Sequence, residues 1–111
     1  MSNKFLSLLG LAQRSGNLIT GEDTCEIYIK KGKVKLIIVA HDASENTKKK
    51  FHDLCVYRNI KIITYGDRDE MSHAIGKSNR AVYGIKDMAF SETLIKLITE
   101  DGHSVKNSGG E

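Results

Sequence analysis

Two short polar stretches of this chain contain the residues best suited to bind a phosphate or a nucleobase. Residues 20–23 connect a predicted strand to a predicted helix, and residues 76–81 form a loop rich in residues that break regular structure. A helix N-terminus presents oriented N–H donors to an anion. In the second stretch, Lys77 and Arg80 could contact phosphates, and Asn79 could bind a base edge or a 2′-hydroxyl. Residue types alone therefore suggest a nucleic-acid surface, provided that the fold brings both stretches together.

The overall charge permits such a surface without requiring it. The formal net charge is +3 and the pI is about 8.9, just below the value of about 9 that marks many nucleic-acid-binding domains. Arg14, Lys31, Lys33 and Lys35 could extend the basic patch. A solvated protein surface explains these residues equally well, so composition leaves both interpretations open.

Residues that could support catalysis are present, but no pattern groups them. They are His41, Asp42, His52, Cys55 and His73. His41 and Asp42 follow the most apolar predicted strand, where open α/β sheets often bind ligands, yet the chain has none of the motifs of serine hydrolases, zinc proteases or P-loop proteins. Cys25, Cys55 and the histidines also lack the spacing of metal ligands. We therefore expect no catalysis, no cofactor and no metal, and we interpret both cysteines as buried thiols.

The first half of the chain predicts the elements that would position residues 20–23. Apolar residues at positions 5, 8, 9 and 12 are spaced as one face of a helix, and Gly16 follows as its cap. Residues 18–19 predict a short strand, and residues 22–31 predict a helix whose start Thr20 would cap. Residues 36–40 are apolar without alternation, which is typical of a strand covered on both faces.

The second half of the chain continues this alternation. It predicts a third helix that starts at Asp42 or Ser44 and ends at Asn59, a strand at residues 60–65, a short helix that starts at Asp67 or Asp69, a strand at residues 81–85, and a last helix capped by Asp87. Strands that alternate with helices indicate a three-layer α/β/α sandwich with a parallel or mixed sheet.

The chain predicts a single domain without a membrane segment. Residues 1–100 would form this domain, and residues 101–111 are polar and glycine-rich, as expected for a flexible tail. No apolar run reaches the length of a transmembrane helix, and no secretory cleavage site follows the first helix. We therefore expect a cytoplasmic protein with no membrane partner.

Several segments together resemble a known family. They are FLSLLGLAQRSGNLITGED, KGKVKLIIVAHDAS, NTKKKF, the strand at residues 60–65, AIGKSNRAVYGIKD and FSETLIKLI. In this order they resemble the L-seven-Ae/L-thirty-e superfamily of ribosomal proteins, and within it the bacterial YlxQ-type ribosomal-protein-like branch, over about residues 4–98. The resemblance implies a four-stranded mixed sheet and binding of kink-turn RNA, a helix–bulge–helix with tandem sheared G·A pairs.

The resemblance also implies which residues would bind RNA. In that family the start of the second helix enters the groove at the G·A pairs, and the loop before the last strand contacts the flipped nucleotide. The matching positions here are Gly21, Glu22, Asp23, Thr24 and Ile27 with the nearby Lys31 and Lys33, and then Ser78, Asn79, Arg80 and Ala81 beside Lys77.

Three of these positions depart from the strongest binders of the family. Those proteins have an amide paired with a carboxylate or a basic residue where this chain has Asp23-Thr24, and a lysine where it has Ile27. Each lost charged contact would cost about 1–3 kcal/mol of binding free energy. We therefore expect a monomeric, non-catalytic protein that binds structured RNA, including ribosomal RNA as a possible target. The alternative is a protein-interaction adaptor that kept the fold and binds RNA weakly.

Overall fold

The computed structural model describes residues 1–102 of the 111-residue chain. Within this range, five helices alternate with four strands: α1 (Asn3–Arg14), β1 (Leu18–Thr20), α2 (Glu22–Lys30), β2 (Leu36–Val39), α3 (Glu45–Arg58), β3 (Lys61–Thr64), α4 (Arg68–Ala74), β4 (Val82–Ile85) and α5 (Met88–Glu100). Every predicted element is present, with ends that differ from the expected ones by one to a few residues.

The four strands form one mixed sheet in the order β1-β4-β2-β3. Strand β2 pairs in parallel with β3, whereas β4 runs antiparallel to both β1 and β2. Because β2 lies inside the sheet, every residue of its Leu-Ile-Ile-Val run is buried, as the unbroken apolar pattern predicted.

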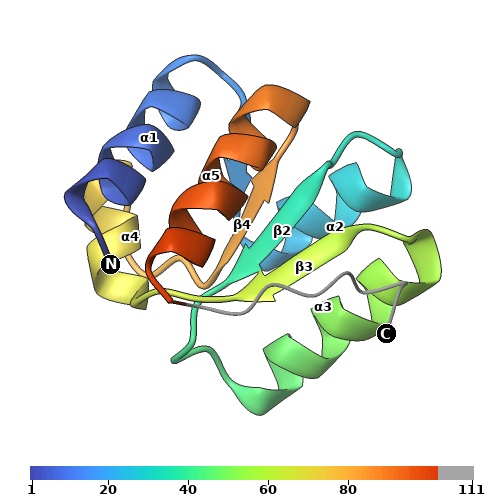
Figure 1. Cartoon of the computed structure of the whole chain (residues 1–111). Coiled ribbons are helices and arrows are strands. Elements are labelled where there is room, and N and C mark those ends of the chain that lie inside the picture. The colour runs from blue at the N-terminus through green and yellow to red at the C-terminus, as the bar shows by residue number, and fades with distance from the viewer. Residues whose placement is uncertain (103–111) are drawn as a thin grey trace.

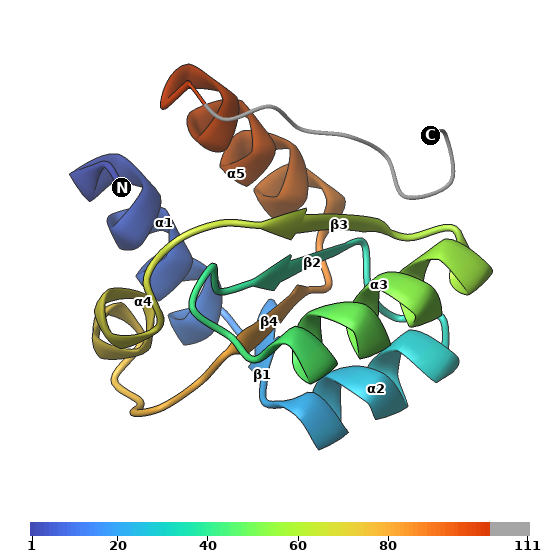
Figure 2. The same ribbon diagram turned by 90° about the horizontal axis from the view of Figure 1, so that it is seen from below.

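Helices cover both faces of this sheet (Figures 1 and 2), which confirms the predicted three-layer sandwich. Helices α1, α4 and α5 lie over one face, where Phe5, Leu9, Tyr83, Leu94 and Ile98 are fully buried. Helices α2 and α3 lie side by side over the other face and bury Cys25, Ile29, Phe51 and Cys55. The side chains of β2 alternate between these two cores, so one strand anchors both helical layers.

Side chains cap most of the helices where the sequence indicates. Ser44 accepts a hydrogen bond from the Thr47 N–H at 3.1 Å, and Asp67 and Asp87 cap α4 and α5 in the same way. The expected cap of α2 is wrong. Thr20 is the last residue of β1 and pairs with Tyr83, so Gly21 takes the cap position and contributes no side chain.

The C-terminal end of α5 is held against the domain. Asp101 is the C-terminal cap residue of this helix, and its carboxylate accepts a hydrogen bond from the Tyr65 hydroxyl at 2.7 Å. Residues 103–111 of the predicted tail lie outside the described part of the chain. Across residues 1–102, no helix combines the length and the apolar character needed to cross a bilayer.

One close contact between α1 and α4 generates a stability prediction. A Cβ atom placed on Gly10 would lie 2.9 Å from the carbonyl oxygen of Ala74, a backbone atom that cannot rotate away. Gly10→Ala should therefore lower the free energy of unfolding by about 1–3 kcal/mol, although alanine is the better helix former by about 1 kcal/mol. Urea denaturation measures the change, with the exposed Ser7→Ala as the control in the same helix. A Gly10→Ala protein as stable as the parent would show that α1 and α4 can move apart at this contact without lowering the free energy of unfolding.

Candidate nucleic-acid interface

The two polar stretches singled out in the sequence lie side by side. The antiparallel pairing of β1 with β4 places Thr20 opposite Tyr83, and the N–H of Gly21 donates to the Val82 carbonyl at 3.0 Å. The end of β1 therefore adjoins the loop that leads into β4. Together they border an open hollow of about 440 Å³, lined by Gly21, Glu22, Asp23, Arg68, Asn79, Arg80 and Ala81. The fold therefore meets the condition under which the two stretches could form one surface.

Gly21 shapes one side of this hollow. Its φ of 94° and ψ of 150° lie where residues with a Cβ atom are strained. A Cβ atom at this position would also lie 3.4 Å from Nη1 of Arg80. With no side-chain cap on α2, the first N–H groups of the helix stay available to an external acceptor.

A buried hydroxyl pair fixes the loop before β4. The N–H of Arg80 donates to Oγ of Ser72 at 2.9 Å, and the Arg80 carbonyl accepts from the Tyr83 hydroxyl at 2.8 Å. The two hydroxyls lie 3.0 Å apart. Burial raises the pKa of Tyr83, so its phenol remains protonated as a donor at neutral pH. The backbone of Arg80 is thus held to α4 on one side and to the sheet on the other.

Arg68 is a residue of this hollow that sequence reasoning missed. Its Nη1 donates to Oδ1 of Asn79 at 3.0 Å, and its Nη2 donates to the Asp42 carbonyl at 2.9 Å. Asn79 itself has a positive φ of 55°, so this hydrogen bond holds the side chain of a residue in the left-handed region. In the sequence, Arg68 is only a charge between two acids, and nothing there indicates that it would reach a loop eleven positions further on.

Both arginines retain a donor that the described residues do not satisfy. The Nε atoms of Arg68 and Arg80 are buried, and neither has a hydrogen-bond partner within residues 1–102. An unsatisfied buried donor on a charged group is costly. A phosphate or base acceptor in the hollow would remove part of this cost, since guanidinium groups match such acceptors closely.

The acids of the α2 N-terminus have different surroundings. Oε2 of Glu22 accepts a hydrogen bond from the Thr47 hydroxyl at 2.9 Å, which ties the start of α2 to the start of α3. Asp23 is exposed beside the hollow. Glu22 therefore has a structural partner, whereas the Asp23 carboxylate faces a potential ligand.

The remaining predicted residues lie around the hollow rather than in it. Thr24 and Ile27 are exposed on the outer side of α2, where Ile27 is 51% exposed. Lys31 and Lys33 follow the C-terminal end of this helix, which lies about 13 Å along the axis from the helix start. Lys77 and Ser78 are exposed in the same loop as Asn79 but do not line the hollow. An extended ligand such as an RNA duplex could reach all of them, whereas a small molecule could not.

Some nearby cations are already neutralised. Glu26 accepts from Lys30 at 2.8 Å and pairs with Lys50 at 2.9 Å, and these two ammonium groups lower its pKa to about 2. Lys35 precedes β2 at the opposite end of the strands from the hollow. Contrary to expectation, it therefore does not extend the basic patch around the hollow. The electrostatics of the hollow therefore depend mainly on Arg68, Arg80 and the helix N-terminus.

The residues considered for catalysis are scattered. His41, His52 and His73 are exposed, the Asp42 carboxylate accepts from the Arg68 N–H, and Cys55 is buried under the sheet. Burial raises the pKa of the thiols of Cys25 and Cys55 to about 12, so both are protonated and poor nucleophiles at neutral pH. The expectation of two free, buried cysteines is confirmed. No cluster of metal-binding side chains occurs in the described range.

Comparison with known proteins identifies the class. The chain belongs to the ribosomal protein L7Ae/L30e/S12e/Gadd45 family, whose model matches residues 3–95. It is 42% identical over 95 residues to the RNA-binding protein YlxQ of Enterococcus faecium, covering 86% of this chain and 91% of that protein. It is 35% identical over 95 residues to the RNA-binding protein YlxQ of Bacillus subtilis strain 168, covering 86% and 95%. The predicted family and its YlxQ-type branch are confirmed, and this membership agrees with the prediction that the chain is not an enzyme.

Solved structures support the same fold. A protein of unknown function from Bacillus halodurans superposes with a TM-score of 0.84 at 43% identity, covering 88% of this chain and 99% of that one. The 15.5kD RNA binding protein of Giardia lamblia superposes with a TM-score of 0.69 at 17% identity, covering 90% and 89%. The second likeness is evidence of shared architecture only.

The buried hydroxyl pair generates a prediction about loop order. Ser72→Ala removes the acceptor of the Arg80 N–H and leaves that buried donor unpaired, which should lower the free energy of unfolding by about 1–3 kcal/mol. The Arg80 amide should then exchange its hydrogen faster than in the parent protein. Hydrogen exchange followed by NMR tests this, with the exposed Ser78→Ala as the control in the same loop. Unchanged exchange at Arg80 would mean that Ser72 does not hold the loop.

Proposed function

We propose that this chain is an RNA-binding protein that recognises kink-turn-type structured RNA at the hollow between the start of α2 and the loop at residues 76–81. The observation that carries the proposal is the meeting of an uncapped helix N-terminus with Arg80, whose buried Nε has no partner within the described chain. The RNA-binding names of the two YlxQ relatives support an RNA partner.

In this mechanism the protein recognises a shape that is already present in the RNA. The N-terminal turn of α2 enters a distorted groove, where the Asp23 carboxylate accepts hydrogen bonds from guanine imino or amino groups. Asn79 and Ala81 contact an extruded nucleotide from the loop side. Because Ser72 and Arg68 hold this loop in place, little conformational entropy is lost when the RNA binds.

Phosphate contacts contribute less here than in a strongly basic member of the family. Asp23 repels phosphate, and Ile27 provides no charge on the exposed side of α2. Lys31 and Lys33 supply positive charge one to two turns beyond Ile27, where the RNA backbone would pass. The affinity should therefore be moderate, and it should depend on salt with a slope set by these few contacts.

The protein would act as a cytoplasmic monomer, and ribosomal RNA is one natural source of such a motif. An adaptor role with weak RNA binding is the second candidate. The observation in its favour is the acidic character of the α2 start, where Glu22 and Asp23 adjoin the hollow.

A titration of labelled kink-turn RNA tests the proposal directly. Binding should be saturable, and it should be lost when the sheared G·A pairs of the RNA are replaced by Watson–Crick pairs. It should weaken as salt is raised, since released counterions oppose association. Fluorescence anisotropy at two salt concentrations measures both effects. Equal affinity for the two RNAs would leave only nonspecific electrostatics and would favour the adaptor role.

Two substitutions test whether RNA affinity depends on particular residues of the site rather than on the overall positive charge of the protein. Arg80→Gln and Lys33→Ala should each lower the affinity for kink-turn RNA by about 1–3 kcal/mol, with the larger loss at Arg80 because it lines the hollow. Thermal denaturation should show nearly unchanged stability, since neither side chain has a hydrogen-bond partner within residues 1–102 that the fold requires. The exposed Lys96→Ala on α5 is the matched control. If both variants bind like this control, the RNA site lies elsewhere.

A further inference from the structure

A second depression lies at the opposite end of the strands from the proposed RNA site. It holds about 500 Å³ and is bordered by the end of α2, the segments that enter β2 and β3, and the start of α5. Its lining residues are Ile29, Gly32, Val34, Lys35, Arg58, Asn59, Ile60, Lys61, Met88, Ser91, Glu92 and Ile95. None of them lines the first hollow, so the two depressions are separate. We refer to this depression as the β2–β3 groove.

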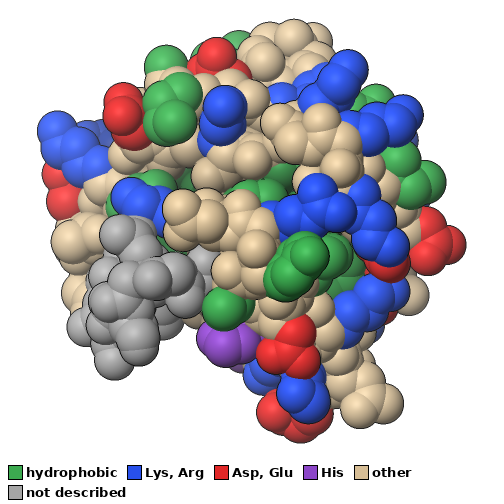
Figure 3. Space-filling view, turned by 90° about the vertical axis from the view of Figure 1, so that its right-hand side faces the viewer, with side chains coloured by type: hydrophobic (Ala, Val, Ile, Leu, Met, Phe, Trp, Pro, Cys, Tyr) green, Lys and Arg blue, Asp and Glu red, His purple; other side chains and the backbone are tan. Residues whose placement is uncertain are grey.

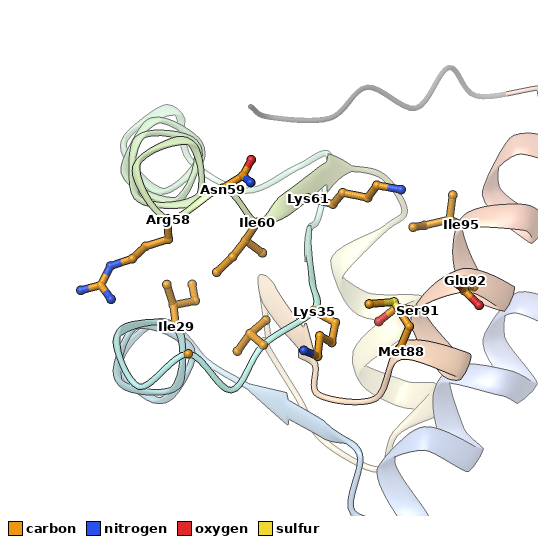
Figure 4. A pocket seen from close by; sticks show the side chains of 12 residues that line it. Ile29, Lys35, Arg58, Asn59, Ile60, Lys61, Met88, Ser91, Glu92 and Ile95 are labelled. Atoms are coloured by element: carbon orange, nitrogen blue, oxygen red, sulfur yellow. The ribbon is translucent and has the colours of Figure 1, made fainter. Parts of the chain in front are cut away.

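The walls of the β2–β3 groove are aliphatic. Figure 4 shows Ile29 and Ile60 on the side of α2 and α3, and Met88 and Ile95 facing them from α5. Met88, the first residue of α5, is 52% exposed, whereas Leu94 and Ile98 of the same helix are buried. Methionine at an exposed groove is typical of surfaces that accept apolar side chains of varied shape.

Two free ammonium groups project beside this apolar surface. Lys35 and Lys61 are exposed, and no carboxylate within the described residues lies within 4.0 Å of either Nζ. In Figure 4 the Lys61 side chain extends from β3 toward Ile95. Arg58 is engaged elsewhere, because its Nη1 donates to the Lys30 carbonyl at 3.1 Å.

Charge differs between the two ends of the strands. The end that carries the groove holds Lys31, Lys33, Lys35, Arg58, Lys61 and Lys86. Figure 3 views the molecule from this side and shows Lys and Arg gathered over it, with hydrophobic side chains between them. The end with the first hollow holds mixed charges: Glu22, Asp23, Asp42, Glu45 and Asp67 together with Arg68, Lys77 and Arg80. The end that carries the groove is therefore the more positive of the two, although Lys31 and Lys33 at this end are assigned to the proposed RNA surface and do not line the groove.

The composition of the groove favours a protein segment over nucleic acid. Nucleobases bind single-stranded sites chiefly by stacking on aromatic rings, and the lining residues include no aromatic side chain. Glu92, which also lines the groove, would repel a phosphate and a carboxylate alike, so it does not distinguish these ligands. An aliphatic side chain flanked by carboxylates would instead pack on Ile60 and Met88 and pair with the two lysines.

We propose that the β2–β3 groove docks an acidic, aliphatic segment of a partner protein, with its apolar side chain between Ile60 and Met88 and its carboxylates at Lys35 and Lys61. The chain would then connect RNA bound at one end of its strands to a partner protein bound at the opposite end. This docking does not depend on the RNA proposal, because the two surfaces share no residue.

Selection from a displayed library of random peptides tests this proposal on the full chain. Peptides that bind should be rich in Asp and Glu around an aliphatic residue. They should shift the NMR signals of Lys35, Lys61 and Met88 but not those of Asp23 and Arg80. The double substitution Lys35→Glu/Lys61→Glu should lower the affinity for these peptides at least tenfold. The matched control is Lys4→Glu/Lys49→Glu, which changes the net charge equally at exposed positions that do not line the groove.

Each other outcome overturns the proposal. The groove would be excluded as a docking site if the selected peptides were basic or bound both double variants equally. It would also be excluded if the peptides shifted the NMR signals of residues in the first hollow. So would a selection that enriches no peptide. A single-stranded RNA that shifts the groove signals at lower concentration than any peptide would make the groove a nucleic-acid site. Titration of both double variants with kink-turn RNA should give equal affinities, so failure of the RNA proposal is seen separately.

Discussion

The lateral pairing of β1 with β4 is the constraint on which the candidate site depends. Thr20 and Val82 are far apart in the sequence, yet the hydrogen bond from the Gly21 N–H continues the ladder directly into the turn that starts α2. The helix start is therefore fixed relative to the loop before β4 by backbone geometry rather than by side chains. Gly21 permits this because its positive φ turns the chain from strand to helix within one residue.

Around this constraint, two sets of side-chain contacts make the surface rigid before any ligand arrives. Ser72 and Tyr83 hold the backbone of Arg80 from below, and Arg68 joins the loop of Asn79 to the loop that follows β2. A preformed surface of this kind selects ligands by shape, since it does not adapt to those that fit poorly. The opposite end of the strands differs, with long lysines and an exposed methionine that can adjust to varied partners.

The sequence was sufficient for the architecture, because hydrophobic period and capping residues act locally. The meeting of the two stretches depends instead on the long-range pairing of β1 with β4. Ser44, Asn59 and Asp87 each mark a helix end by chemistry within a few residues. It failed where sheet pairing outweighs local preference: Thr20 is a good cap, but its backbone is extended in β1. Arg68 was missed for a related reason, since its partners Asp42 and Asn79 approach only after the sheet has formed. The β2–β3 groove likewise combines three separate stretches, residues 29–35, 58–61 and 88–95, none of which carries a motif.

The contact between the two ends of the domain has a further consequence for engineering. The amine of Met1 lies 4.0 Å from the Asp101 carboxylate, which also accepts from Tyr65. A chain that ends at Asp101 could be joined to Met1 by a short linker, and new ends opened at an exposed turn such as Gly32, without changing any strand neighbour. Such a circularly permuted chain would keep the same sheet while reversing the order in which β1 and β4 emerge during synthesis. It would therefore reveal whether their pairing needs β1 to be made first.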